Sequence, residues 1–190
     1  MISRIKLYLS RAVRFVISGE PKVFVRVDSV QQGKLLFGKN IIITGASSGI
    51  GYEIAKKCLL EGGNVLCVAR NEEKLMAAIE KLKNETGNDD VHYLQWDIAD
   101  ISVCENKCRK AIDLLGGHID CLVNSAGMTS KVNIADCTPE QWDNIFNVNL
   151  KGLFFITSEF VKQFVRQESG GNIVNIASQA GLNAQTPLMR

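Results

Sequence analysis

The sequence predicts an α/β fold in which helices cover both faces of a doubly wound parallel sheet of about five strands. Short apolar runs, such as NVLCVA and NIVNIA, recur along the chain. Runs that are apolar on both faces are typical of parallel strands buried between helices. Longer amphipathic patterns separate them, as expected for strand–helix–strand units with right-handed crossovers. Three of the runs follow a Gly-Gly pair, which is typical of a helix end.

Strands and helices alternate regularly from residue 41 onward. The apolar runs predict strands at residues 41–44, 65–69, 91–95, 119–124 and 173–177. The amphipathic patterns predict helices at about 50–60, 72–83, 103–115 and 139–166. Thr138 is a suitable N-cap for the last helix and Pro139 fits its first turn, whereas a break in that helix near Asn149 stays open. We therefore assign residues 39–190 to one sheet domain.

The composition is ordinary for a soluble globular protein, with 46% hydrophobic and 22% charged residues among 190. No run of eighteen apolar residues occurs, so we expect no membrane-spanning helix. The net charge of +2 is uneven, because residues 1–40 hold eight Lys or Arg against two acids and the remainder holds fourteen against eighteen. The body of the chain therefore carries no nucleic-acid footprint.

Six cysteines are present, and most of them lie inside apolar patterns such as VLCVA and IDCLV. No Cys-x-x-Cys occurs, and the chain has only two histidines. We therefore predict buried free thiols in a reducing compartment and no metal site.

Residues 1–38 form a basic arm ahead of the sheet domain. A helix over residues 1–17 would be apolar on one face and carry Arg4, Arg11 and Arg14 on the other, with no acid. Such a helix suits an anionic membrane surface. A mitochondrial targeting peptide, or a helix docked on this protein or on a partner, fits the same pattern. The expected location is thus cytoplasmic and peripheral to a membrane, with mitochondria as the alternative.

A glycine-rich segment, TGASSGIG, connects the first strand to the first helix. Gly45 allows a sharp turn, Gly49 allows a pyrophosphate to approach the backbone, and Gly51 allows close packing of helix on strand. The helix N-terminus then offers unpaired N–H groups to phosphates. A plain tight turn is the alternative. The predicted dinucleotide contacts in this segment are Thr44, Gly45, Ser47, Ser48, Gly49, Ile50 and Gly51.

The second strand ends in Ala69-Arg70-Asn71. An acid at this point would bind the ribose 2′-hydroxyl of NAD, whereas arginine suits the 2′-phosphate of NADP. We therefore predict NADP over NAD, with an ordinary surface arginine as the alternative.

With this loop, the sequence resembles the short-chain dehydrogenase/reductase family, whose fold is Rossmann-like. Asp97, followed by Ile98, resembles the acid that holds the adenine ring. The segment Asn124 to Gly127, which includes Ala126, is similar to the family's Asn-Asn-Ala-Gly, with Ser125 replacing the second asparagine. Asn149 and Ser178 match the catalytic asparagine and serine.

The resemblance implies hydride transfer between a nicotinamide and the carbonyl or alcohol carbon of a small-molecule substrate. Ser178 would hydrogen-bond the carbonyl oxygen, and Asn149 would position water for proton delivery. A tyrosine would transfer the proton, and a lysine four residues later would lower the pKa of that tyrosine. The family also implies that a full-length enzyme can be a homo-oligomer.

The family's tyrosine follows its serine by about a dozen residues, which would place it just past Arg190. Tyr52 and Lys56 have the Tyr-x-x-x-Lys spacing. We reject them as the catalytic pair because they lie on the helix whose N-terminus faces the pyrophosphate. We expect a C-terminally truncated oxidoreductase that is inactive alone. The alternative is a dinucleotide-binding or interaction protein without catalysis.

Overall fold

The computed structural model describes residues 34–130 and 132–178. The predicted parallel α/β sheet is confirmed, with the strand order β3-β2-β1-β4-β5. The strands are β1 (Asn40–Thr44), β2 (Asn64–Ala69), β3 (Val91–Gln95), β4 (Cys121–Asn124) and β5 (Asn172–Asn175). The helix proposed for residues 1–17, and the membrane contact drawn from it, lie outside the described residues.

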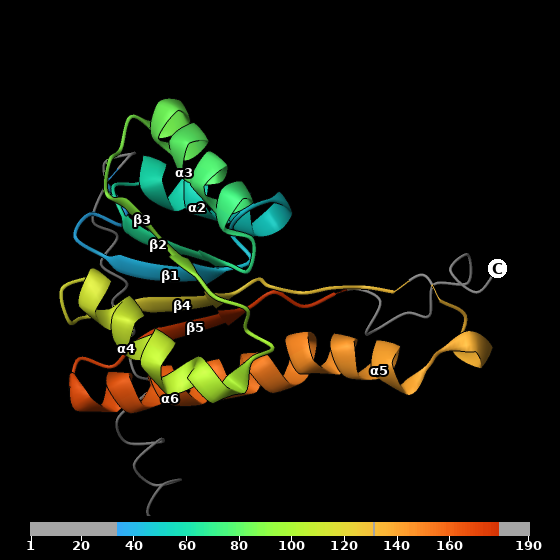
Figure 1. Ribbon diagram of the computed structural model, residues 1–190. Coiled ribbons are helices and arrows are strands. Elements are labelled where there is room, and N and C mark those ends of the chain that lie inside the picture. Colours follow the sequence, from blue (N-terminus) through green and yellow to red (C-terminus); the bar gives the residue numbers. More distant parts are fainter. Residues whose placement is uncertain (1–33, 131, 179–190) are drawn as a thin grey trace, which may run out of the picture. The chain divides into compact units, whose positions relative to one another are not determined.

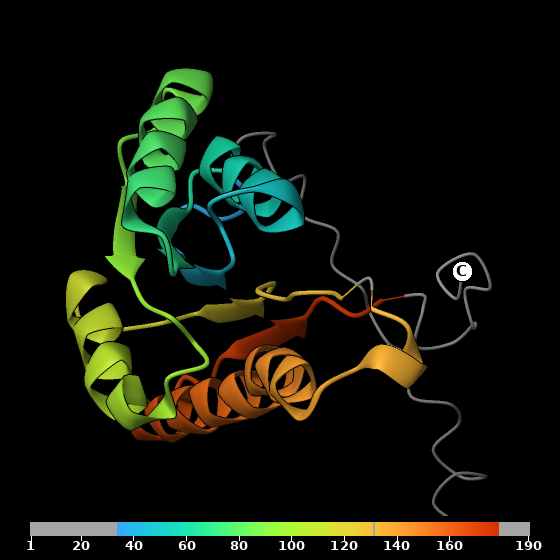
Figure 2. The ribbon, with the colours of Figure 1, turned by 45° about the vertical axis from the view of Figure 1, so that its right-hand side comes forward.

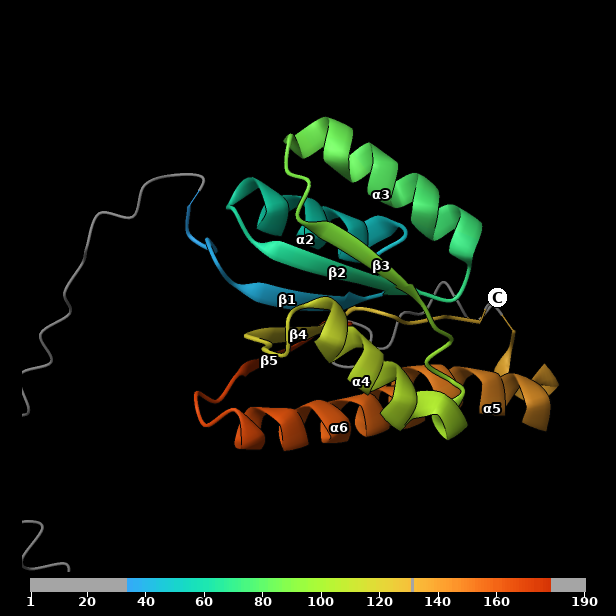
Figure 3. The same ribbon diagram turned by 60° about the vertical axis from the view of Figure 1, so that its left-hand side comes forward.

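Helices cover both faces of the sheet, as Figures 1 to 3 show. On one face lie α2 (Gly49–Leu60) and α3 (Glu72–Thr86), and on the other lie α4 (Cys104–Leu114) and α6 (Leu153–Arg166). A short helix, α5 (Pro139–Phe146), extends past the carboxyl ends of the strands in Figure 1. In the part of the chain that the structure describes, no helix has the length and apolarity needed to cross a bilayer.

Two hydrophobic cores result from the alternation of side chains along the strands. In β1, Ile41 and Ile43 pack into the core beneath α2 and α3, whereas Ile42 packs into the core beneath α4 and α6. All three are almost fully buried. The same two-sided burial in β2 and β4 is the physical reason that the central strands are apolar without alternation, whereas β3 and β5, at the sheet edges, are partly or fully exposed.

The predicted helix 139–166 is interrupted, and this settles the possibility left open by the sequence. A six-residue π-helical turn, Asn147–Gly152, separates α5 from α6 and contains Asn149. The predicted cap of α5 is confirmed, because the Thr138 side chain accepts a hydrogen bond from the Gln141 N–H and the Gln141 side chain bonds back.

The first glycine of each Gly-Gly pair has a positive φ, 80° at Gly62, 72° at Gly116 and 68° at Gly170. Gly62 and Gly116 directly follow the C-caps of α2 and α4, whereas after α6 the left-handed residue is Glu168, with a φ of 58°.

Asp120 ties the start of the sheet together. Its carboxylate accepts hydrogen bonds from the Lys39 ammonium at 2.8 Å and from the Asn40 N–H at 2.9 Å. The His118 imidazole lies 3.5 Å away. Partial burial disfavours ionisation, but the bonds from Lys39 and Asn40 outweigh it and hold the pKa of Asp120 below its usual value.

Replacing Asp120 by alanine is expected to lower the free energy of unfolding at pH 7 by about 1.5–3 kcal/mol, the usual range for hydrogen bonds to a charged group. Because the folded pKa is depressed, this contribution is complete above the unfolded pKa of about 4 and is lost as pH falls through the folded pKa. Urea unfolding at several pH values measures it. Asp89→Ala, at an exposed carboxylate 3.7 Å from Lys83, is the control. An equal effect of the two substitutions at pH 7 would contradict the assignment.

Candidate functional site

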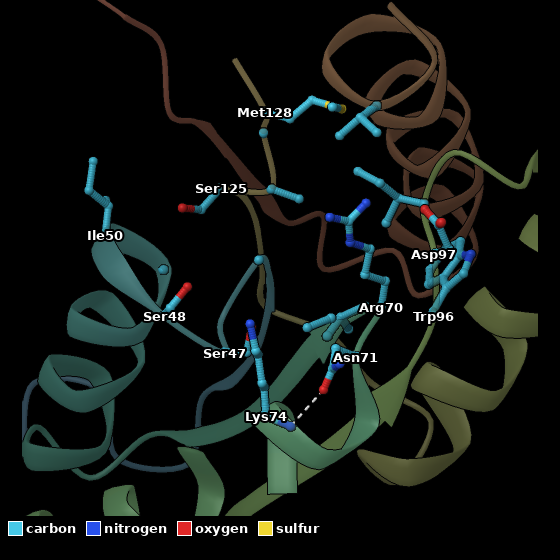
Figure 4. A pocket seen from close by; sticks show the side chains of 18 of the residues that line it. Ser47, Ser48, Ile50, Arg70, Asn71, Lys74, Trp96, Asp97, Ser125 and Met128 are labelled. Carbon is cyan, nitrogen blue, oxygen red and sulfur yellow. Dashed lines mark hydrogen bonds between the residues drawn. The ribbon is translucent and has the colours of Figure 1, made fainter. Parts of the chain in front are cut away.

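A pocket of about 480 Å³ opens at the carboxyl ends of β1, β2 and β4, where ligands bind in open α/β sheets. Its walls come from the loops that follow these strands and β3, together with Val148 of the π-helical turn and Ile176 just after β5. Figure 4 shows the pocket from close by. Most of the predicted cofactor contacts line it, namely Gly45, Ser47, Ser48, Ile50, Gly51, Arg70, Asp97, Ile98, Ala126 and Gly127. The structure thus brings together residues from four separate loops.

The glycine loop has the geometry expected for a phosphate-binding turn. Gly45 has a φ of 72°, and a Cβ there would lie 2.7 Å from the Ala126 Cα. A Cβ on Gly51 would lie 2.5 Å from the Gly45 carbonyl oxygen, so α2 starts in direct contact with the end of β1. Gly49 differs, because a Cβ on it would meet nothing within 4 Å. Glycine at position 49 is thus explained by its φ of 59° and not by a lack of space.

The N-terminus of α2 is suited to an anion. Ser48 is the N-cap, but its side chain makes no capping hydrogen bond, and the first turn holds no acidic residue. The first N–H groups of a helix have no partner within the helix and carry a partial positive charge. These features fit the pyrophosphate of a dinucleotide, and Figure 4 shows Ser47 and Ser48 beside the same space.

The loop after β3 forms the opposite wall with Trp96, Asp97 and Ile98. One carboxylate oxygen of Asp97, Oδ1, accepts the Ala99 N–H at 3.0 Å, which fixes the turn. The Ile98 carbonyl is held against Gly152 of the π-helical turn, where a Cβ would lie 2.2 Å from its oxygen. This close approach sets the position of the wall that the sequence assigns to adenine.

Two predicted contacts, Thr44 and Asn124, are almost fully buried and do not line the pocket. The Thr44 hydroxyl accepts hydrogen bonds from the N–H groups of Ser125 and Ala126, both at 3.1 Å. The Asn124 amide donates to Thr157 Oγ1 at 3.0 Å and to Asn175 Oδ1 at 2.9 Å. Both side chains are therefore buried beneath the pocket wall. Thr44 holds the loop after β4, and Asn124 joins the end of β4 to α6 and β5. Gly49 does not line the pocket either, although its neighbours Ser48 and Ile50 do.

Asn149 does not line the pocket but binds a residue that does. Its side chain accepts the Met128 N–H and donates to the Met128 carbonyl, both at 2.8 Å. Met128 lines the pocket, together with Val148. The π-helical turn thus places the Asn149 amide against the loop after β4, in agreement with the tendency of such turns to occur at functional sites.

The structure places Ser178 in the exposed segment just beyond β5, and it does not line the pocket. Tyr52 and Lys56 are held elsewhere. The Tyr52 hydroxyl donates to Glu85 Oε2 at 2.9 Å, and the Lys56 ammonium lies 3.1 Å from the same oxygen. Burial and the bond to Glu85 raise the pKa of Tyr52 to about 12. These contacts support our rejection of Tyr52 and Lys56 as the catalytic pair.

Sequence reasoning missed several residues of the pocket. Asn71 and Lys74 line it from the start of α3, and Trp96 lines it from the loop after β3. A usable signal for Asn71 and Lys74 was present, since Arg70 directly follows β2 and α3 begins two residues later. The first turn of α3 then lies at the same edge of the sheet as Arg70.

Comparison with known proteins agrees with this geometry. The family model for short chain dehydrogenases matches residues 39–188. An uncharacterised oxidoreductase of Staphylococcus epidermidis is 36% identical over 143 residues, which are 75% of this chain and 59% of the relative. One of Thermotoga maritima is 32% identical over 151 residues, or 80% of this chain and 57% of its own. The chain thus spans less than two thirds of the length of these relatives.

Solved structures show the same sheet. A short chain dehydrogenase from Mycobacterium smegmatis has a TM-score of 0.74 at 32% identity, covering 80% of this chain and 62% of that protein. A variant of actinorhodin polyketide ketoreductase, solved with NADPH, has a TM-score of 0.72 at 30% identity, covering 80% and 58%. With sequence, family model and fold in agreement over the residues that form the pocket, the chain belongs to the short-chain dehydrogenase family.

Proposed function

We propose that this chain binds NADP and belongs to an enzyme that moves a hydride between the nicotinamide and the carbonyl or alcohol carbon of a small molecule. The observation that carries the proposal is the pocket, which joins a phosphate-binding turn at Gly45–Gly51 to an arginine at the end of β2. Arginine suits a 2′-phosphate as a charge-assisted partner. The structural relative solved with NADPH supports the same choice.

The chain's own residues would bind and orient the cofactor. The α2 N-terminus would hold the pyrophosphate, and Asp97 would accept from the adenine amine through the carboxylate oxygen that Ala99 does not use. Met128, Val148 and Ile176 would form the apolar side of the pocket. The bound nicotinamide supplies or accepts the hydride. Ser178 would donate a hydrogen bond to the substrate oxygen, and Asn149 would position water while holding Met128.

A second candidate is a dinucleotide-binding protein without catalysis. One observation favours it, namely that no tyrosine in the described part of the chain lines the pocket. Tyr52 is bound to Glu85, and Tyr93 lies on β3 outside the lining residues. Both candidates require nucleotide binding, so binding is the first property to test.

Calorimetric titration of the chain with NADPH and with 5′-ADP is expected to show saturable binding of both. Asp97→Asn should weaken both by about tenfold, equivalent to about 1.4 kcal/mol, because the amide keeps an acceptor for Ala99 but replaces the free oxygen by a donor. Asp100→Asn is the matched control, since Asp100 forms the same kind of turn with Ser102 and lies outside the pocket lining. Absence of binding, or equal effects of the two substitutions, would contradict the proposal.

A further inference from the structure

Two cationic side chains line the pocket, Arg70 and Lys74, and the proposed function gives a role only to Arg70. Lys74 is the third residue of α3, and its side chain lies on the pocket wall. Figure 4 shows the side chain extending from the helix toward Ser47 of the glycine loop. Arg70, which directly follows β2, also lines the pocket.

Within the described residues, neither of these two cations is paired with another side chain. Among residues 34–130 and 132–178, no hydrogen bond or ion pair engages the Lys74 ammonium or the Arg70 guanidinium. Other lysines of α3 are paired, since Lys81 lies 3.6 Å from Glu85 and Lys83 lies 3.7 Å from Asp89. Among the three lysines of α3, the one without a partner in the described residues is therefore the one that lines the pocket.

Hydrogen bonds to the backbone of Lys74 and Arg70 hold both residues beside the pocket. Asn71 caps α3 by accepting the Lys74 N–H at 2.8 Å, which fixes the first helical turn. The Arg70 carbonyl accepts the Gln95 side-chain amide at 3.0 Å, which fixes the strand end against β3. Lys74 and Arg70 are thus four residues apart, and a hydrogen bond holds the backbone of each beside the pocket.

We propose that Lys74 is a specificity-determining residue that binds the adenosine 2′-phosphate of the cofactor together with Arg70; this inference rests on the proposed function. A phosphate monoester carries about −1.5 to −2 charges at pH 7, so one guanidinium leaves much of that charge unbalanced. The Lys74 ammonium supplies the second positive charge. The Ser47 hydroxyl, on the wall that Lys74 faces, completes a polar cradle.

The test compares 2′,5′-ADP with 5′-ADP, and NADPH with NADH, by calorimetric titration of the full chain. Lys74→Gln should weaken the two ligands that carry the 2′-phosphate by about tenfold and change the other two by less than about twofold. Lys74→Arg keeps the charge and should restore most of the loss. Lys83→Gln, on the same helix but outside the pocket, should change none of the four affinities. Thermal unfolding of each variant checks that the fold is kept.

Two results would overturn the inference while leaving nucleotide binding intact. Equal weakening of all four ligands by Lys74→Gln would place the lysine on the pyrophosphate, and no change in any would remove it from the site. Failure of the unmodified chain to bind any of the four ligands would instead overturn the proposed function, and this inference with it. Raising the salt concentration should reduce the preference for 2′,5′-ADP, because the contact is ionic.

Discussion

The 190-residue chain is expected to bind NADPH and yet to reduce carbonyls more slowly than a full-length relative by about 10²–10⁴-fold, the usual contribution of one positioned general acid. Reduction places a proton on the carbonyl oxygen, and the donor must lie within hydrogen-bond reach of that atom. In the described part of the chain, no tyrosine or histidine lines the pocket. Steady-state oxidation of NADPH with a panel of small aldehydes and ketones measures the rate.

A binding control distinguishes a slow chemical step from a failure to bind the cofactor. Calorimetric binding of NADPH must be present in the same preparation, so that a low rate reports proton transfer and not loss of the cofactor. Tyr52→Phe should leave any residual rate unchanged, because the Tyr52 hydroxyl is bound to Glu85 away from the pocket. Turnover at the rate of a full-length relative, or its loss in Tyr52→Phe, would refute the expectation.

Replacing Gly152 by alanine is expected to destabilise the protein by about 3 kcal/mol or more, at the upper end of the cost of overpacking. A Cβ at this position would lie 2.2 Å from the Ile98 carbonyl oxygen and 3.0 Å from the Asn147 carbonyl oxygen. Both are backbone atoms, so relief requires movement of the loop after β3 or of the π-helical turn. Because Ile98 lines the pocket, NADPH affinity should fall as well. Urea unfolding and calorimetry measure the two effects.

Gly87→Ala is the matched comparison for this substitution. Gly87 ends α3 with a φ of 65°, and a Cβ there would meet nothing within 4 Å. Alanine at Gly87 should cost only the left-handed backbone penalty, about 1–2 kcal/mol, and should leave NADPH affinity unchanged. If Gly152→Ala proved no more costly than Gly87→Ala, close packing of the π-helical turn on Ile98 could not be what holds this wall.

Much of the site could be predicted from the sequence because its determinants are local. A glycine at position 45 is needed by the turn itself, and the φ of 72° agrees with that need. Arg70 and Asp97 follow strands, so their place at the carboxyl edge comes directly from the strand pattern. The same reasoning assigned cofactor contacts to Thr44 and Asn124. The structure shows that, from within the core, the Thr44 side chain bonds the loop after β4 and the Asn124 side chain bonds α6 and β5.

By itself, then, the sequence determined the parallel sheet, the glycine turn and the edge where the pocket opens, since apolar runs and turn residues act over a few neighbouring positions. Only the tertiary structure decided which side chains face the pocket and which lie behind it. Lys74 reaches the pocket because α3 packs beside β2, and Asn149 reaches Met128 because a π-helical turn changes the direction of its side chain. The Asn149–Met128 contact joins residues 21 positions apart, so no local pattern specifies it.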